Sequence, residues 1–303
     1  MNDHELWEST MSEIWQFYLP GDSRAFGYLI PATVSQMPWT SDFRLDHSAR
    51  TIRLLPQDSH STSLEASSAA AMEKLLRAAQ DADSFPHLSN WPGEKFPVLG
   101  SPFLFGIDRA IAPYLGIVTT GAQLTVFVRD EHGSVAGVWI PRRGINKPMY
   151  GGMLDNAVGG AVEQGETPFQ SLVREAKEEL GIDARSAVSG GTISWINVKG
   201  ARSGVAEGVV EPGVQYVYDL EVDAKAVLRP AESGIEWLRL LSVEEVKAAL
   251  FQHEFKPSCA CVMIDFLVRH GMINAENERD LAEIVSRLHR RLPLPTTYPQ
   301  EVA

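Results

Sequence analysis

The 303-residue sequence predicts an α/β fold with a mixed sheet, preceded by a smaller α+β unit. Runs of β-forming residues alternate with helical segments through the second two thirds of the chain, which is typical of an α/β domain. The segments before residue 105 form a separate group, and the pattern changes after Pro102. We therefore expect an N-terminal α+β accessory domain over residues 1–105 and a second domain with C-terminal helices over residues 106–303.

The stretch of residues 160–182, GAVEQGETPFQSLVREAKEELGI, predicts a helix with clear ends. Thr167 is placed to act as N-cap, Pro168 stands at the first helical position, and Gln170 completes a capping box. Gly181 supplies the C-terminal stop. Apolar residues recur at helical spacing between these ends and predict one buried face.

Three glutamates gather on the opposite face of that helix. Glu175, Glu178 and Glu179 are related by i,i+3 and i,i+4 spacing, which costs about 0.2–0.5 kcal/mol per like-charge pair. Such a run is usually a solvated acidic face. Here the pair Gly159-Gly160 precedes it and lets the backbone approach a ligand closely. A glycine pair with clustered carboxylates suits Mg²⁺, which prefers oxygen ligands and substrate phosphates.

The full pattern G-x5-E-x7-R-E-U-x-E-E-x-G-U, in which U is a bulky aliphatic residue, resembles the Nudix box. The matching residues are Gly160, Glu166, Arg174, Glu175, Glu178, Glu179, Gly181 and Ile182, and Ala176 is smaller than the residue usual at its position. The resemblance implies a Nudix α/β/α sandwich from about residue 110 onward. It also implies a Mg²⁺-dependent diphosphatase in which Mn²⁺ can substitute for Mg²⁺.

The same resemblance implies roles for the box residues. The metal ligands would be Glu175, Glu178 and Glu179, with the carbonyl of Gly159 or Gly160 as a further ligand. Arg174 would orient a glutamate, and Glu166 would support the helix start. The attacking water would lose its proton to one box glutamate, with Glu175 or Glu179 favoured, or to an acid outside the box. The candidates outside the box are Glu207, Glu211 and Glu236.

Substrate-binding candidates lie outside the box. Arg142 and Arg143 follow a β-type run and suit a phosphate clamp as well as they suit surface ion pairs. Residues 149–156, with Asp155 and Asn156 at their end, are expected to contact the organic group of the substrate. The rings of two tyrosines could stack on that group, but they share one strand face, so packing is the favoured reading; they are Tyr216 and Tyr218.

Five further segments resemble one Nudix subfamily that carries an extra N-terminal domain and is related to thiamine-diphosphate-processing proteins. They are residues 139–143, 152–156, 214–220, 255–260 and 264–271. This resemblance implies hydrolysis of thiamine diphosphate, or an oxidised analogue, to the monophosphate. The chain departs from that subfamily at Glu166, Arg174 and Gly234, so a prenyl diphosphate, for example a sesquiterpenyl one in fungal specialised metabolism, is the alternative substrate. A Nudix-fold isomerase and a nucleotide sensor are weaker alternatives.

The composition limits the kinds of partner that the protein is expected to bind. The net charge of −12 argues against nucleic-acid binding, which needs a basic surface. No apolar run approaches the roughly 20 residues of a membrane span, and the N-terminus lacks the pattern of a signal peptide. The two cysteines, Cys259 and Cys261, are expected to be buried or semi-buried thiols. We expect a cytoplasmic protein that binds a small-molecule diphosphate, with a homodimer left open.

The remaining elements follow from local patterns along the chain. Strands are expected near residues 26–31, 51–55, 124–128, 135–140, 192–198, 214–222 and 235–240. Helices are expected near residues 6–18, 63–79, 243–251, 259–270 and 278–292, with a helix or linker over 103–115 and a loop over 203–212. Residues 130–133, DEHG, predict a hairpin turn, and Thr62 with Glu65 predicts a capping box.

Overall fold

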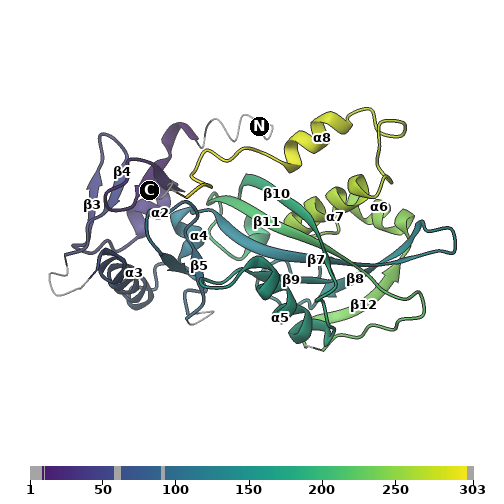
Figure 1. Ribbon diagram of the computed structural model, residues 1–303. Helices are drawn as coiled ribbons and strands as arrows, with labels where there is room; N and C mark the ends of the chain where they lie inside the picture. The colour runs from purple at the N-terminus through teal and green to yellow at the C-terminus, as the bar shows by residue number, and fades with distance from the viewer. Residues whose placement is uncertain (1–8, 10, 58–62, 90–92, 232, 299–303) are drawn as a thin grey trace, which may run out of the picture.

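The computed structural model describes residues 9, 11–57, 63–89, 93–231 and 233–298. Its elements in chain order are β1(Trp15–Tyr18), β2(Ala25–Leu29), α2(Pro31–Gln36), β3(Phe43–Asp46), β4(Thr51–Leu54), α3(Leu64–Asp81), β5(Lys95–Pro97), β6(Gly106–Asp108), α4(Ala112–Leu115), β7(Thr119–Arg129), β8(Val135–Arg143), β9(Val158–Ala161), α5(Pro168–Leu180), β10(Val188–Val198), η1(Ala201–Ser203), β11(Val210–Glu221), β12(Ile235–Leu241), α6(Val243–Phe251), α7(Pro257–Arg269) and α8(Leu281–Leu288). Figure 1 shows the first strands and α3 at one end and the larger sheet with α5–α8 at the other.

The N-terminal sheet has the strand order β2-β1-β4-β3. One face of α3 packs on its core through Met72 and Leu75. The helix expected over residues 6–18 is wrong at its C-terminal end, because residues 15–18 form β1; residues 1–8 and 10 lie outside the described part. Trp15 and Phe17, at positions i and i+2, are both buried, and this is the spacing of a strand face and not of a helix face.

The helix expected over residues 63–79 is confirmed as α3. Its N-cap is Ser63, whose side chain accepts a hydrogen bond from the backbone N–H of Ala66. The capping box expected from Thr62 and Glu65 falls partly outside the described residues, since Thr62 is not among them.

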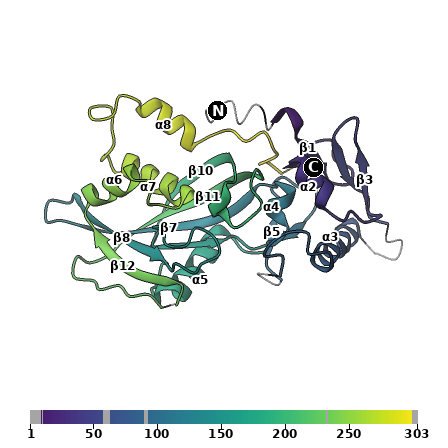
Figure 2. The same cartoon turned by 180° about the vertical axis from the view of Figure 1, so that it is seen from behind.

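The larger sheet is mixed, with the order β10-β11-β7-β8-β12 and with β9 paired to β7. β11 and β7 run parallel, and the other neighbouring strands run antiparallel. Helix α5 covers one face through Leu172 and Ala176, whereas α6 and α7 cover the other through Val246, Met263 and Phe266. Figure 2 shows the same three layers from behind. The predicted α/β/α sandwich is confirmed.

The junction between the two parts is built from the β5–β6 hairpin and α4. The expected boundary at 105/106 falls inside this hairpin, because Pro97 pairs with Gly106. The buried cluster of the N-terminal part continues through Tyr114 and Leu115 to Ile117. We therefore use the term N-terminal unit for the described residues before Thr119, where β7 begins.

The C-terminal segment returns to the N-terminal unit. Figures 1 and 2 show the chain after α8 running back to the N-terminal strands. There Leu292 and Leu294 pack in one buried cluster with Ile14 and Tyr28. The hydroxyl of Tyr28 donates to the carbonyl of Pro293 at 3.4 Å. The two parts are thus joined through α4 and again through the tail. Among the described residues, no helix is long and apolar enough to cross a membrane.

Candidate active site

Helix α5 has the predicted ends. The Thr167 side chain accepts from the N–H of Gln170 at 3.2 Å, and the Gln170 side chain accepts from the N–H of Thr167 at 2.8 Å. Pro168 starts the helix, and Gly181 closes it in the left-handed region with a φ of 67°. The small residue Ala176 is fully buried against the sheet. These contacts fix the face of α5 that carries the glutamates.

Arg174 is the centre of an acidic cluster. Its guanidinium forms two hydrogen bonds of 3.0 Å to the two carboxylate oxygens of Glu166. It also lies 3.0 Å from Glu175, 3.4 Å from Glu178 and 3.5 Å from Glu163. Hydrogen bonds from Arg174 and then Ser171 hold the pKa of Glu166 below its ordinary value, although burial opposes them. Arg174 therefore orients the carboxylates, and Glu166 is fixed at the start of α5.

Two box glutamates lie against the glycine pair of β9. A Cβ built on Gly160 would overlap the carboxylate of Glu175. The N–H of Gly159 donates to Glu179 Oε2 at 3.1 Å. Burial raises the pKa of Glu175, while the neighbouring Arg174 acts to lower it. The Glu175 carboxylate can thus lie against β9 because residue 160 has no side chain, whereas a Cβ at Gly159 would meet Gln123.

The oxygen-rich set at β9 fits a hard divalent cation. Glu175, Glu179 and the backbone of Gly159 and Gly160 provide such ligands, whereas Glu178 is 57% exposed and faces Arg174. Within the described part of the chain, no three His, Cys, Asp or Glu side chains are arranged as a metal site. The three-glutamate ligand set therefore stays a prediction.

Arg143 and Asp155 belong to a buried network beside these acids. Arg143 Nη1 donates to Asp155 Oδ2 at 2.6 Å, and the Cys259 thiol donates to Asp155 Oδ1 at 2.7 Å. Burial acts to raise the pKa of Asp155, but the charges of Lys256 and Arg143 hold it below its ordinary value. A small pocket next to the network is lined by Arg143, Asp155, Asn156, Gly159 and Glu179. Asp155 is thereby engaged within the protein.

The predicted clamp of two arginines is not formed. Arg142 and Arg143 are consecutive residues of β8, so their side chains leave opposite faces of the strand. Arg142 lies 3.8 Å from Glu236 and lines a different pocket, with Arg202 and His253. Arg143 alone lies on the side of the box acids.

The two tyrosines are packing residues, the reading favoured from the sequence, and the alternative of substrate stacking is corrected. Tyr218 is buried, Tyr216 is partly buried, and both lie in the cluster beneath α5. The rings of Tyr218 and Phe169 have centroids 5.7 Å apart. Burial raises the pKa of both tyrosines. Their face of β11 is turned toward α5.

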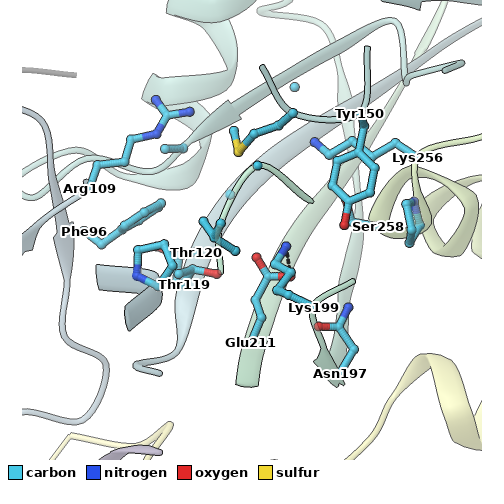
Figure 3. Close-up of a pocket in the computed structure, with 18 of the residues that line it drawn as sticks. Phe96, Arg109, Thr119, Thr120, Tyr150, Asn197, Lys199, Glu211, Lys256 and Ser258 are labelled. Carbon is cyan, nitrogen blue, oxygen red and sulfur yellow. Dashed lines mark ion pairs between the residues drawn. The ribbon is translucent and has the colours of Figure 1, made fainter. Parts of the chain in front are cut away.

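A larger pocket lies between the N-terminal unit and the sandwich, and we call it the inter-unit pocket (Figure 3). Its volume is about 170 Å³. One end reaches Gly159 and Gly160, the backbone against which the two glutamates lie. Side chains that line it include Phe96, Arg109, Tyr114, Thr120, Gln123, Tyr150, Trp195, Asn197, Lys199, Glu211, Gln215 and Lys256.

Most of these lining residues were missed by the sequence analysis. Asn197 in β10 and Lys199 just after it are two residues apart, and Glu211 lies in β11. This alternation predicts a polar sheet face and could have located these pocket residues from the sequence. Lys199 Nζ lies 2.6 Å from Glu211, as Figure 3 shows. Of the loop acids proposed as bases, Glu211 is the one that lines this pocket; Glu207 is exposed and Glu236 faces Arg142.

The pocket floor is built from large side chains opposite glycines. Across neighbouring strands, Trp195 faces Gly213, Gln215 faces Gly121, and Gln123 faces Gly159. A Cβ on any of these glycines would collide with the facing side chain, so each large side chain lies across its neighbour. Among the described residues, four buried polar atoms that belong to pocket residues have no protein hydrogen-bond partner: Thr120 Oγ1, Trp195 Nε1, Asn197 Oδ1 and Gln215 Oε1. Buried polar atoms are costly unless a partner satisfies them, so this face of the pocket suits water or a polar ligand.

The chain matches the model of the NUDIX domain over residues 119–259. It is 30% identical to an uncharacterized protein of Saccharomyces cerevisiae over 293 residues, which cover 91% of this chain and 83% of the yeast protein. It is 29% identical over 225 residues to Nudix hydrolase 20, chloroplastic, of Arabidopsis thaliana, covering 73% of this chain and 58% of the plant protein.

Among solved structures, the crystal structure of DR0079 from Deinococcus radiodurans is similar. It is 22% identical, with a TM-score of 0.37, and the match covers 65% of this chain and 100% of that one. The matched domain begins at β7 and includes α5 with its acids and the glycine pair. The chain therefore belongs to the Nudix hydrolase family.

Proposed function

We propose that this protein hydrolyses an organic diphosphate to the monophosphate and inorganic phosphate, with Mg²⁺ as cofactor. The observation that carries the proposal is the contact of Glu175 and Glu179 with the Gly159-Gly160 backbone, because the same two glycines line the inter-unit pocket. A diphosphate at that end would leave the rest of the pocket for the organic group. The box glutamates and a carbonyl of the glycine pair would hold the metal.

The reaction breaks one P–O bond of the phosphoric anhydride. A water oxygen attacks one phosphorus, the bridging oxygen leaves with the other phosphate, and a carboxylate takes the proton of the water. Mg²⁺, when bound, neutralises the diphosphate charge and lowers the pKa of a coordinated water. Among the acids considered, Glu175 is favoured as base because its pKa is raised by burial. Arg174 holds that carboxylate in place.

The favoured substrate is thiamine diphosphate or an oxidised analogue. Trp195 and Tyr150 offer aromatic faces to a planar heterocycle, and Glu211 offers a carboxylate to a ring cation. The unpartnered atoms of Asn197 and Gln215 are oxygen acceptors that suit the amino group of a pyrimidine. We thus assign the organic group to the face of β10 and β11 that carries Trp195 and Gln215. The opposite face of β11, which carries Tyr216 and Tyr218, packs under α5.

The alternatives receive less support. A prenyl chain would cover the unpartnered polar atoms of the floor without satisfying them, at a cost of about 1–3 kcal/mol per atom. An isomerase that used a cysteine would need a reactive thiol at the pocket, but neither Cys259 nor Cys261 lines the inter-unit pocket. Burial raises the pKa of both thiols, that of Cys259 to about 12. A nucleotide sensor would not require the complete acidic box. The cytoplasmic location and the homodimer also stay proposals.

A phosphate-release screen tests the function. The panel contains thiamine diphosphate, its oxidised analogues, a prenyl diphosphate, ADP-ribose and a nucleoside diphosphate sugar, each with Mg²⁺. We expect a thiamine-type compound to have the highest kcat/KM and activity to disappear in excess EDTA and return with Mg²⁺ or Mn²⁺. A prenyl diphosphate turned over at least about tenfold more efficiently, about 1.4 kcal/mol, would reject the substrate and keep the hydrolase. Full turnover in EDTA would reject the metal role.

A further inference from the structure

The N-terminal unit contacts the catalytic domain directly at the Nudix box. The N–H of Gln164, in the loop between Gly160 and Glu166, donates to the carbonyl of Lys95 in β5 at 2.9 Å. The Gln164 side chain lies so close to Gly106 of β6 that a Cβ there would collide with it. The β5–β6 hairpin is therefore seated on the loop that leads from the glycine pair to α5.

Arg109 stands at the end of this hairpin. It follows β6 directly, and its N–H donates to the carbonyl of Glu94 at 2.9 Å. Its guanidinium pairs with the Glu94 carboxylate, and the two side chains are 28% and 33% exposed. Figure 3 shows Arg109 beside Phe96, across the inter-unit pocket from Tyr150 and Lys256. Arg109 thus lines the same pocket as Gly159 and Gly160.

Arg109 lies on the same pocket as the backbone that contacts Glu175. The Glu175 carboxylate lies against Gly160, and both Gly160 and Arg109 line the inter-unit pocket. A diphosphate placed between Glu175 with its metal and the pocket would therefore come within the field of Arg109. Guanidinium groups match phosphate oxygens with two parallel hydrogen bonds.

The other cations near the box are held more strongly by the protein. Arg174 is surrounded by four acids, and Arg143 is paired with Asp155 inside the buried network. Lys199 is 9% exposed and pairs with Glu211. The pair of Arg109 with Glu94 is more exposed than the pairs of Arg143 and Lys199, and the contribution of an ion pair falls as its exposure to water rises. A diphosphate can therefore compete with Glu94 for Arg109 more readily than with Asp155 for Arg143.

We infer that Arg109 binds the diphosphate of the substrate, so that the N-terminal unit completes the active site of the Nudix domain. This inference rests on the proposed diphosphatase function, and it assigns the clamp that Arg142 and Arg143 do not form. It also gives the N-terminal unit a role in substrate binding, because Arg109 follows the β5–β6 hairpin and lines the pocket.

The test measures binding of methylenediphosphonate, a diphosphate analogue that cannot be hydrolysed at its bridge, to the full chain with Mg²⁺ by calorimetry. We expect Arg109→Gln to weaken binding at least about tenfold, about 1.4 kcal/mol. Arg109→Lys keeps the charge but loses the paired hydrogen bonds, and we expect a loss of about threefold. Melting curves check that each variant is folded, and Arg109→Lys serves if Arg109→Gln is not.

Two controls separate binding from a structural role. Glu94→Gln removes the same ion pair but leaves the arginine, so binding should stay within about twofold of wild type or become tighter. Arg129→Gln removes a comparable pair, with Glu221, on β7 outside the pocket, and should also stay within about twofold. Equal weakening by Glu94→Gln and Arg109→Gln, an unchanged Arg109→Gln, or no binding to wild type would overturn the inference. The probe lacks an organic group, so its binding does not depend on which substrate the enzyme turns over. A failure to hydrolyse thiamine diphosphate would therefore not decide whether Arg109 binds a diphosphate.

Discussion

At the scale of single residues, Asp155 connects three parts of the sandwich. It accepts from Arg143 of β8 and from Cys259 of α7, and its own backbone lies between β8 and β9. Lys256, at the N-cap of α7, adds a nearby positive charge. The network fixes Arg143 and the adjoining Asn156 next to the small pocket that contains Glu179. We therefore propose that Asp155 positions the site through these contacts.

We predict that Asp155→Asn lowers the free energy of unfolding at pH 7 by about 3 kcal/mol, because it leaves buried cations without their anion. Asp183→Asn, in an exposed pair with Arg185, should leave the free energy of unfolding almost unchanged. The folded pKa of Asp155 lies below its ordinary value, so its stabilisation is complete above about pH 4 and is lost as the pH falls toward the folded pKa. Urea titrations of both variants and wild type between pH 7 and pH 3 check this. A difference that grows toward low pH would contradict the assignment.

At the scale of elements, Gly160 allows strand β9 and the Glu175 side chain of helix α5 to lie close together. The Glu175 carboxylate occupies the space that a side chain at position 160 would need. Gly160 does not have a positive φ, so alanine can adopt its backbone conformation. The Cβ of that alanine would nevertheless collide with the Glu175 side chain. The glycine is thus required by the carboxylate and not by the strand.

We predict that Gly160→Ala displaces Glu175 and lowers kcat at least about a hundredfold, about 2.7 kcal/mol, and weakens metal binding. Gly200→Ala is the matched control, since a Cβ there meets nothing within 4 Å and the φ is −100°. We expect that control to keep its activity within about twofold. Steady-state rates over a Mg²⁺ titration measure both effects, and an unchanged rate in Gly160→Ala would remove Glu175 from the mechanism.

At the scale of the whole molecule, the tail after α8 ties the catalytic domain to the N-terminal unit. Leu292 and Leu294 are 8% and 4% exposed and complete a cluster with Ile14 and Tyr28. This contact acts together with the docked β5–β6 hairpin, so the two sides of the inter-unit pocket are held from two directions. The geometry of the pocket therefore depends on residues far from it in sequence.

We predict that the double variant Leu292→Ala with Leu294→Ala lowers the free energy of unfolding by about 4 kcal/mol or more, since each buried leucine contributes about 2–5 kcal/mol. The control replaces Val227 and Phe251, which are 73% and 90% exposed, by alanine, and should change it by less than about 1 kcal/mol. Differential scanning calorimetry measures both. Equal losses in the two double variants would show that the tail contact is not a stabilising one.

The sequence by itself determined the parts of the protein that depend on neighbours in the chain. The ends of α5 were predictable because capping residues act within one turn, and the hairpin of β7 and β8 was predictable from DEHG, where the N–H of Gly133 donates to the carbonyl of Asp130. The acidic box was readable because its spacing is the spacing of one helix. The sandwich followed from these local patterns together with the family resemblance.

Only the tertiary structure decided which side chains share a space. Arg142 and Arg143 are adjacent in sequence, but strand alternation separates them, whereas Arg109 and Gly160 are far apart in sequence and line the same pocket. The pairing of Trp195 with Gly213, or of Gln215 with Gly121, depends on strand register. Register is set by long-range packing and not by local propensity, because a shift of one residue turns every side chain to the other face. For that reason the sequence located the acids, and the fold located the pocket beside them.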